Sequence, residues 1–358
     1  MPSRLIKNTA IVALNETTYG VDASPLPANV IAASNLQFDP YVAKWVKRDL
    51  IRPYLGGSEE LPGEKYCTMS FETEIVGSGT AGTAPAWSVL PRGAGFAETI
   101  TATTRVDYTP ISTALESVTI YWYDDGVLYK GRGARASGGL RYKVGELPKL
   151  VTNFIGLYTQ VTAAALPSVN YSSYKQPQVV LNGNTQKLVL GATHSISGAP
   201  ALVGGTPYTS QGIEIDFGIA NGFTALLGDE SVDITDRDVT GKIVLDVTAA
   251  QEVAFAAAID AGTLSSLGLQ HGTVVGNRSL IWAPSSQMRN PKRVDVNGKR
   301  LMGYDVRILP INGNDELRIV TFVSSMDGTT LLMPLPLTSP NNMILALDAT
   351  AKEIVYEI

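Results

Sequence analysis

Residues 117–158 constrain the fold of this chain more than any other stretch of its sequence. Residues 118–123 (VTIYWY) alternate between two faces of an extended chain, because neighbouring side chains of a strand point in opposite directions. Asp125-Gly126 follows, and this dipeptide favours a tight hairpin since glycine accepts a positive φ without steric cost. We therefore expect a four-stranded antiparallel meander. Its strands are predicted at 118–123, 127–130, 140–144 (after a glycine-rich link) and 149–158.

The composition of the chain agrees with a protein built mainly of strands. With 358 residues, 44% of them hydrophobic, the chain has room for two domains with real cores. Its 34 glycines and 20 prolines favour many turns and short strands over long helices. The net charge of −5 disfavours general nucleic-acid binding, which needs an excess of cations to neutralise phosphates. A single cysteine, Cys67, excludes an intrachain disulfide, and we expect it to be reduced and buried.

The sequence contains no sign of a membrane segment. Its first residues lack the apolar core of a signal peptide. No stretch reaches the roughly 18–20 apolar residues that span a bilayer. We expect a chain that is made in the cytosol, is soluble there and does not associate with a membrane.

Residues 40–66 form a long polar segment that also carries large apolar side chains. Loops longer than about 12–15 residues usually bind something or are disordered, and disordered segments rarely contain so many aromatic groups. We therefore interpret this segment as a loop that binds a partner, with a passive surface loop as the alternative. The candidate contact residues are Trp45, Lys47, Arg48, Asp49, Arg52, Tyr54 and Leu55.

The second half of the chain repeats the order of the first. A strand at 66–76, a short helix within 84–96 and the meander are followed, roughly 170 residues later, by a strand, a helix and a second meander. The later elements are expected at 242–248, 249–261 and 279–323, after a second acidic loop at 221–238, and residues 145–154 resemble residues 315–322. We predict a first β domain at 1–170, a duplicated domain at 171–335 and a C-terminal arm at 336–358, in which Met343 and Leu345 are candidate contacts. The alternative is a chance likeness of two β-rich halves.

No arrangement of residues suggests catalysis or a cofactor. Residues 77–82 (GSGTAG) fit the spacing of a dinucleotide-binding loop. However, the preceding strand alternates polar and apolar residues, whereas the first strand of such a fold is buried on both faces. We interpret the glycines as a flexible link. The two histidines, His194 and His271, are far apart in sequence, so a zinc site is not expected, and we predict neither an enzyme nor a cofactor.

Several motifs occur in an order that resembles the major tail tube proteins of long-tailed, siphovirus-like bacteriophages. The resemblance covers about the first 170 residues, which is one domain length. The segments that carry it are 16–20 (ETTYG), 47–56 (KRDLIRPYLG), 77–87 (GSGTAGTAPAW), 95–99 (GFAET) and 147–158.

This resemblance implies a mainly β fold and a structural function. The expected fold is two tandem tail-tube-like β-sandwich or barrel domains, each with a short helix, that assemble into a ring with a β-barrel lumen. Two such domains per chain imply a trimeric ring with pseudo-sixfold symmetry, and a hexamer if the second half is a decoration. The ring would stack with other rings in the virion tail, after synthesis in the host cytoplasm. Its other partners would be tape measure, terminator and distal tail proteins, with DNA only in transit.

Two other functions remain possible from the sequence. The chain could be another virion β-protein, such as a tail terminator or decoration protein. It could also be a carbohydrate-binding β-sandwich, in which Tyr121 and Tyr123 would form the binding platform. The tail tube interpretation is preferred because unpaired sheet edges invite aggregation unless something covers them, and a closed ring of subunits pairs them all.

Overall fold

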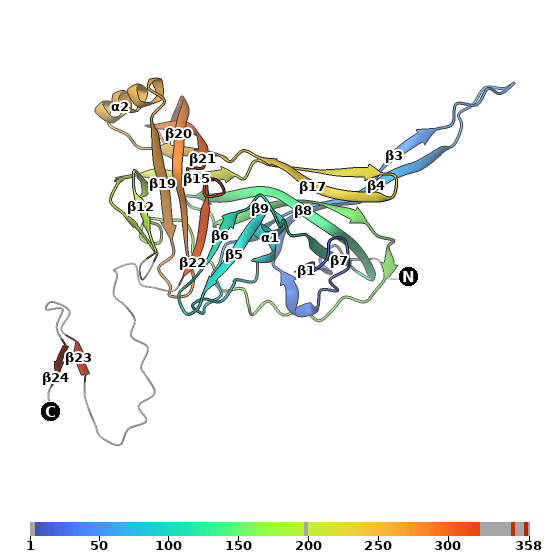
Figure 1. Ribbon diagram of the computed structural model, residues 1–358, viewed down its shortest axis with the longest axis horizontal. Coiled ribbons are helices and arrows are strands. Elements are labelled where there is room, and N and C mark those ends of the chain that lie inside the picture. Colours follow the sequence, from blue (N-terminus) through green and yellow to red (C-terminus); the bar gives the residue numbers. More distant parts are fainter. Residues whose placement is uncertain (1–3, 197–199, 323–344, 348–353, 357–358) are drawn as a thin grey trace, which may run out of the picture.

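The computed structural model describes residues 4–196 and 200–322, together with the backbone of 345–347 and 354–356. The fold is mainly β, as predicted (Figure 1). Pairing joins eighteen of the described strands into one sheet network. The first half contributes β1 (Thr9–Asn15), β2 (Val30–Ile31), β3 (Ala33–Lys47), β4 (Glu60–Glu74), helix α1 (Val89–Gly93), β5 (Phe96–Thr101), β6 (Arg105–Pro110), β7 (Val118–Asp124), β8 (Val127–Lys143), β9 (Lys149–Tyr158) and β10 (Thr162–Ala163).

The second half contributes a similar series of elements. Its helix, α2, ends one residue before the end of the predicted range 249–261. The Thr248 side chain accepts a hydrogen bond from the backbone N–H of Gln251 at its start, and Gly262 follows the helix with a positive φ of 64°. The elements are β11 (Leu188–Leu190), β12 (Thr193–Ser195), β13 (Ala201–Val203), β14 (Thr206–Tyr208), β15 (Ser210–Asp216), β16 (Ile219–Leu226), β17 (Asp229–Arg237), β18 (Thr240–Leu245), α2 (Ala249–Asp260), β19 (Leu264–His271), β20 (Arg278–Val296), β21 (Lys299–Leu309) and β22 (Arg318–Phe322).

The two halves share seven antiparallel strand pairings. In the first half these are β1–β2, β1–β7, β7–β8, β8–β9, β8–β10, β4–β9 and β3–β4. In the second half they are β11–β14, β11–β19, β19–β20, β20–β21, β20–β22, β18–β21 and β15–β18. Each strand of one set therefore has a counterpart at the same place in the other. The counterpart of β9 is β21, so the match drawn from sequence between residues 145–154 and 315–322, which lie on β9 and β22, is wrong.

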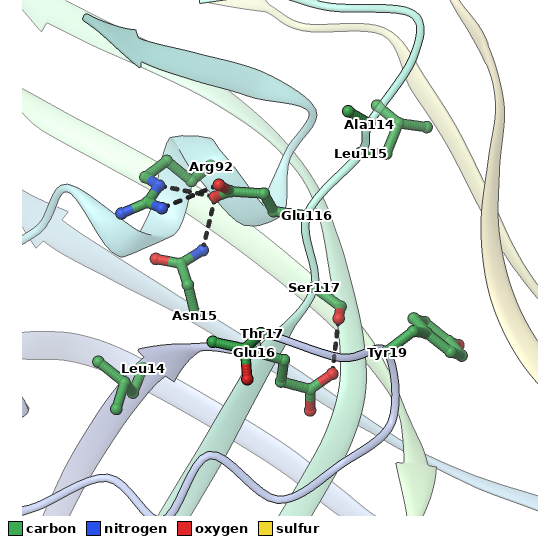
Figure 2. Close-up of a pocket in the computed structure, with 10 residues that line it drawn as sticks. All are labelled: Leu14, Asn15, Glu16, Thr17, Tyr19, Arg92, Ala114, Leu115, Glu116 and Ser117. Carbon is green, nitrogen blue, oxygen red and sulfur yellow. Dashed lines mark hydrogen bonds and ion pairs between the residues drawn. The ribbon is translucent and has the colours of Figure 1, made fainter.

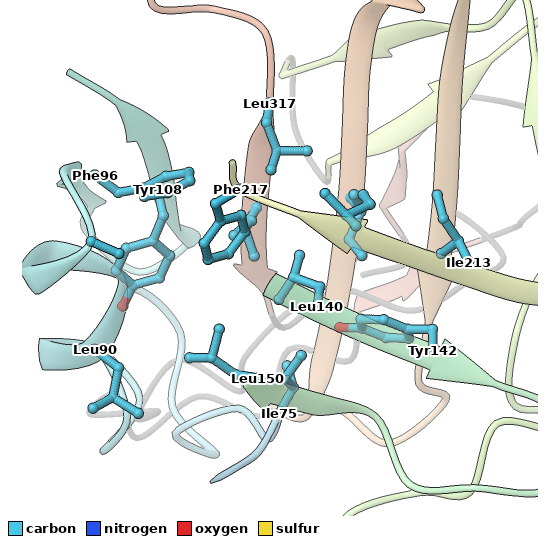
Figure 3. Packing of buried hydrophobic residues seen from close by; sticks show 14 of the residues in the cluster. Ile75, Leu90, Phe96, Tyr108, Leu140, Tyr142, Leu150, Ile213, Phe217 and Leu317 are labelled. Atoms are coloured by element: carbon cyan, nitrogen blue, oxygen red, sulfur yellow. The ribbon is translucent and has the colours of Figure 1, made fainter. Parts of the chain in front are cut away.

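Two further pairings join the halves. Residues 139–143 of β8 pair with residues 216–212 of β15, and β6 pairs with β22. The first junction creates a continuous sheet with the strand order β3, β4, β9, β8, β15, β18, β21, β20. One hydrophobic core lies behind this sheet and contains residues of both halves, among them Leu90, Leu140 and Phe217 (Figure 3). Burial of apolar area in this shared core favours one cooperative body.

Three predicted elements differ from the structure. Residues 127–143 form one strand, β8, so the meander has three strands and not four. The glycines interpreted as a link lie inside β8 because neighbouring strands come close: an added Cβ on Gly138 or Gly139 would lie 2.0 Å from a carbonyl oxygen of β9 or β15. The predicted loops at 40–66 and 221–238 are mostly strands, since β3 continues to Lys47, β4 begins at Glu60, and β16 and β17 form a hairpin.

Candidate assembly surfaces

The ends of β3 and β4 form a long hairpin that extends beyond the rest of the molecule (Figure 1). Its large apolar side chains have no cover within the chain. Ile51 and Leu55 at the tip are fully exposed, at 104% and 103% of their reference areas. The other exposed apolar residues of this hairpin are Tyr41, Trp45, Val46, Leu50, Tyr54 and Leu61. Contiguous exposed apolar groups of this kind mark a surface that another molecule covers.

The charged candidates lie on the same hairpin, and three of them, Lys47, Arg48 and Arg52, bridge its two arms. Lys47 Nζ lies 3.9 Å from a carboxylate oxygen of Glu60. Glu59 receives a hydrogen bond from Arg48 and lies 3.6 Å from the guanidinium of Arg52. Exposed ion pairs of this kind add little to the free energy of unfolding, so we interpret their role as fixing the conformation of the hairpin tip.

The structure brings most of the predicted contact residues together. All seven candidates between Trp45 and Leu55 lie on β3 or in the segment that follows it. Leu345 lies on β23 (Leu345–Leu347), which pairs with β24 (Ile354–Tyr356). Met343 lies outside the described residues.

Two edges of the eight-stranded sheet are unpaired among the described residues. β3 pairs with β4 along one side only. At the other end of the sheet, β20 pairs with β19 up to Gln287, and from Met288 to Val296 it pairs only with β21. An unpaired edge presents backbone N–H and C=O groups that can pair with another chain. Sequence reasoning expected open edges in general, but it could not identify them because they depend on the order of strands.

The face of this sheet that points away from the core is polar. Glu72 of β4 accepts hydrogen bonds from Lys149 Nζ at 2.6 Å, Asn35 Nδ2 at 2.8 Å and Arg141 Nη1 at 3.3 Å. The hydrogen bond from Lys149 is the main reason why the pKa of Glu72 lies below its usual value. Arg141 also lies 3.8 Å from Glu214 across the junction of the halves. Cations on this part of the face are therefore paired with carboxylates.

A depression beside the first strand has a structural role. Its lining includes Glu16 and Ser117, together with Arg92, whose guanidinium donates two hydrogen bonds to Glu116 at 2.6 and 2.8 Å (Figure 2). The carboxylate of Glu16 accepts hydrogen bonds from the hydroxyls of Ser117 and Thr119 and from the backbone N–H groups of two glycines. With its acceptors occupied in this way, Glu16 fixes the turn that contains the ETTYG segment.

The glycine-rich segment at 77–82 is a packing site. Gly77 donates its backbone N–H to Asn277 Oδ1 at 2.7 Å, and Gly79 donates to the carbonyl of Gly276 at 2.9 Å. A Cβ added to Gly77 would lie 2.0 Å from the Gly276 oxygen. The interpretation as a flexible link missed this contact, because its partner lies about 200 residues away in the chain.

The described residues give little support to a catalytic or carbohydrate-binding site. Within them, no group of three or more His, Cys, Asp or Glu residues could hold a metal ion. Burial raises the pKa of the Cys67 thiol to about 12, which makes it a poor nucleophile. Tyr121 is buried and donates its hydroxyl to Asp22, so it cannot serve as an exposed platform. None of the helices in the described part of the chain has the length and apolar character to cross a membrane.

Comparison with known families gives one match. A family model described as phage tail tube protein matches residues 7–311. This range includes both sets of strands up to β21, whereas the sequence motifs covered only the first half. No curated protein matches the chain.

Proposed function

The chain belongs to the phage tail tube protein family and is a structural subunit of the tail tube in the virion, and from this premise we propose that three copies close each ring of the tube. The observation that carries the proposal is the repeated set of seven strand pairings, joined edge to edge within one chain. Each chain then supplies two equivalent units, predicted at 1–170 and 171–335. Three chains give six units and a pseudo-sixfold ring.

The inner wall of this ring would be the eight-stranded sheet continued from copy to copy. One face of the sheet is packed against the core, so only the polar face is available to line a passage. On this face Lys149 and Arg141 are engaged by Glu72, and Glu214 and Asp216 are exposed. Cations that are paired with carboxylates hold DNA phosphates less firmly than free cations, which suits a conduit through which DNA passes.

The hairpin of β3 and β4 would contact a neighbouring copy. Burial of its exposed tip residues would remove apolar surface from water, which favours association. The proposed contact residues are the seven between Trp45 and Leu55, together with Met343 and Leu345 in the C-terminal arm. Tape measure, terminator and distal tail proteins would meet the ends of the assembled tube.

The mass of one ring tests the trimer. We expect electron microscopy of the purified protein to reveal rings or tubes, and native mass measurement of a ring to give three times the chain mass of 38.1 kDa. A ring of six chains would contradict the proposal and favour the second half as a decoration. A protein that stays monomeric at all concentrations, with no rings, would contradict self-assembly itself.

The hairpin tip can be tested separately. The double variant Ile51→Ser/Leu55→Ser should keep the unfolding midpoint of the isolated chain, because both side chains are fully exposed, but should assemble poorly. The matched control is Ile100→Ser, which changes an exposed apolar residue on β5 at 52% of its reference area. Equal assembly of the two variants by light scattering would contradict a contact at the tip.

A further inference from the structure

We propose that the junction between neighbouring copies repeats the junction inside each copy, so that residues 35–39 of β3 pair with residues 292–296 of β20 in the next copy. This inference rests on the proposed ring. It goes further by naming the two edges, their direction and their register. The occupant of each free edge is a second copy of this chain.

The first argument is that β3 is the counterpart of β15. Each is the outer partner of the strand that follows the hairpin, β4 or β18. Each has a bulge near its start, between Ser34 and Gln37 in β3 and between Ser210 and Ile213 in β15. Beyond the bulges, Leu-Gln-Phe-Asp at 36–39 corresponds to Ile-Glu-Ile-Asp at 213–216, with apolar and polar residues in the same order.

The second argument is that β20 is the counterpart of β8. They are the two longest strands, with 19 and 17 residues. Each pairs first with the strand before it in the chain, β19 or β7, and is bulged where that pairing ends. Beyond this point β8 pairs with β15, whereas the same edge of β20 is unpaired among the described residues.

The ladders between these strands set the register. Asp39 and Asp216 are equivalent, and they face Thr68 of β4 and Thr240 of β18. These threonines pair with Ile155 of β9 and Arg307 of β21, which are therefore equivalent. Six residues earlier on these two strands, Lys149 pairs with Arg141 of β8, and Leu301 pairs with Val294 of β20. β20 has an extra residue between Arg289 and Lys292 that β8 lacks, so we take the register from the pairs beyond it. Lys292 lies opposite Gly303 as Gly139 lies opposite Val151, and Lys292 therefore occupies the position of Gly139. Because Asp216 lies opposite Gly139 within the chain, Asp39 is expected opposite Lys292 of the next copy.

The charges at this position are complementary. Asp39 is exposed, and Lys292 is exposed apart from a 3.5 Å approach to Asp305. Residues directly opposite each other in an antiparallel pair have Cβ atoms about 5 Å apart, where opposite charges favour the pairing. Lysine on an open edge also discourages wrong partners, since it must find a carboxylate when the edge is covered.

The hairpin that follows each outer strand supports the same arrangement. The counterpart of residues 40–66 is the hairpin β16–β17, which lies against the first half of its own chain. There Phe223 stacks on Tyr66 with ring centroids 5.1 Å apart, and Asn221 Nδ2 donates to the Arg135 carbonyl at 2.9 Å. By the same geometry, residues 40–66 would lie against the second half of the next copy. At the tip of β16–β17, Leu227 is fully exposed, so by this analogy the next copy would cover residues 40–66 along their strands and not at the tip.

Cysteine cross-linking tests the register. The variant Asp39→Cys/Lys292→Cys should form disulfides between copies on mild oxidation and yield a covalent trimer in denaturing, non-reducing gels. The two positions lie on opposite edges of the sheet in one chain, seven strand spacings of about 4.8 Å apart, so a bond within one copy is excluded. The native Cys67 is buried, and its pKa is raised to about 12, so it does not compete.

The matched control is Asp39→Cys/Asp295→Cys, which moves one cysteine three residues along β20 to the other face. It should cross-link at least tenfold less. Equal cross-linking of both pairs, or none in a variant that still forms rings by microscopy, would overturn the inferred edges and leave the ring itself standing. Absence of rings in the unmodified protein would instead remove the proposed function.

Charge reversal gives a second measurement that does not depend on a new disulfide. Asp39→Lys and Lys292→Asp should each slow assembly, and the double variant should recover most of the rate, as monitored by light scattering. Additive losses in the double variant would contradict the pairing of these two residues. Circular dichroism of each variant checks that the chain is folded before assembly is compared.

Discussion

The two halves of this chain share their strand pairings but differ in how deeply their helices are buried. In the first half, α1 is only five residues long and most of it is buried, with Leu90 fully inaccessible. In the second half, α2 has twelve residues, of which only Phe255 is buried, and Val253 is 71% exposed. The sheet is therefore the repeated part, and the helices are adapted to different surroundings.

A second difference concerns the two junctions between the halves. Between α1 and β7 the first half carries the hairpin β5–β6, and β6 pairs with β22. Between α2 and β19 the second half has no such hairpin. The β6–β22 junction can therefore occur only inside a chain, whereas the β8–β15 junction has free counterparts on β3 and β20. In the proposed ring, this asymmetry would give two strand pairings at each junction inside a chain and one at each junction between copies.

The largest difference in stability between the two halves should come from substitutions in their helices. Leu90→Ala removes a fully buried side chain and should lower the free energy of unfolding by about 3 kcal/mol, because it leaves a cavity in the shared core. Val253→Ala at the exposed helix should change it by less than about 0.5 kcal/mol. Denaturant unfolding of the unassembled chain measures both. Similar losses would mean that α2 is as well packed as α1.

The next largest effect should come from the internal junction. A Cβ at position 139 would lie 2.0 Å from the Ile215 carbonyl oxygen, so Gly139→Ala should force the strands apart at a cost of about 2 kcal/mol. Thermal unfolding should register the loss as a lower midpoint. Gly222→Ala is the control, because this strand glycine has no atom within 4 Å of an added Cβ. A midpoint for Gly139→Ala equal to that of the control would show that the halves are not held closely at this junction.

The sequence predicted the elements whose signals are local. The alternation at 118–123, the Asp125-Gly126 turn and the capped helix at 249–260 all appear in the structure. The helical spacing of Val253, Ala256 and Ala257 predicts an apolar stripe on this helix, but Val253 is exposed and Phe255 is the buried residue. Phe255 is buried by Tyr208 and Tyr304 from strands distant in sequence, and no helical pattern reveals such partners.

Properties that depend on distant segments could not be predicted. Glycines in β8 were interpreted as a flexible link, although Gly139 is required by the approach of β15, more than 70 residues later. The segment at 40–66 was selected as a candidate contact because its apolar side chains had no obvious internal partner, and the structure leaves many of them exposed. The two arms of its hairpin show little alternation of polar and apolar residues, so the sequence pattern alone predicted a loop.

The smallest effect concerns the polar face, where the halves also differ. Following the ladders, the counterpart of Glu72 is Val244, so only the first half has a carboxylate that collects three donors. Because the pKa of Glu72 is lowered in the folded chain, its contribution is complete above the unfolded pKa of about 4.3 and is lost as the pH falls through the lower folded value. Glu72→Gln should therefore lower the free energy of unfolding by about 1 kcal/mol at pH 7 and by progressively less below about pH 4.

The comparison in the second half is Asp305→Asn, which removes a partner of the exposed Lys292 and should lower the free energy of unfolding by less than about 0.5 kcal/mol. Urea unfolding of the unassembled chain between pH 3 and pH 7 would measure both. A pH-independent cost for Glu72→Gln would mean that the carboxylate acts by its shape and not by its charge, and that the polar faces of the two halves are more alike than their sequences suggest.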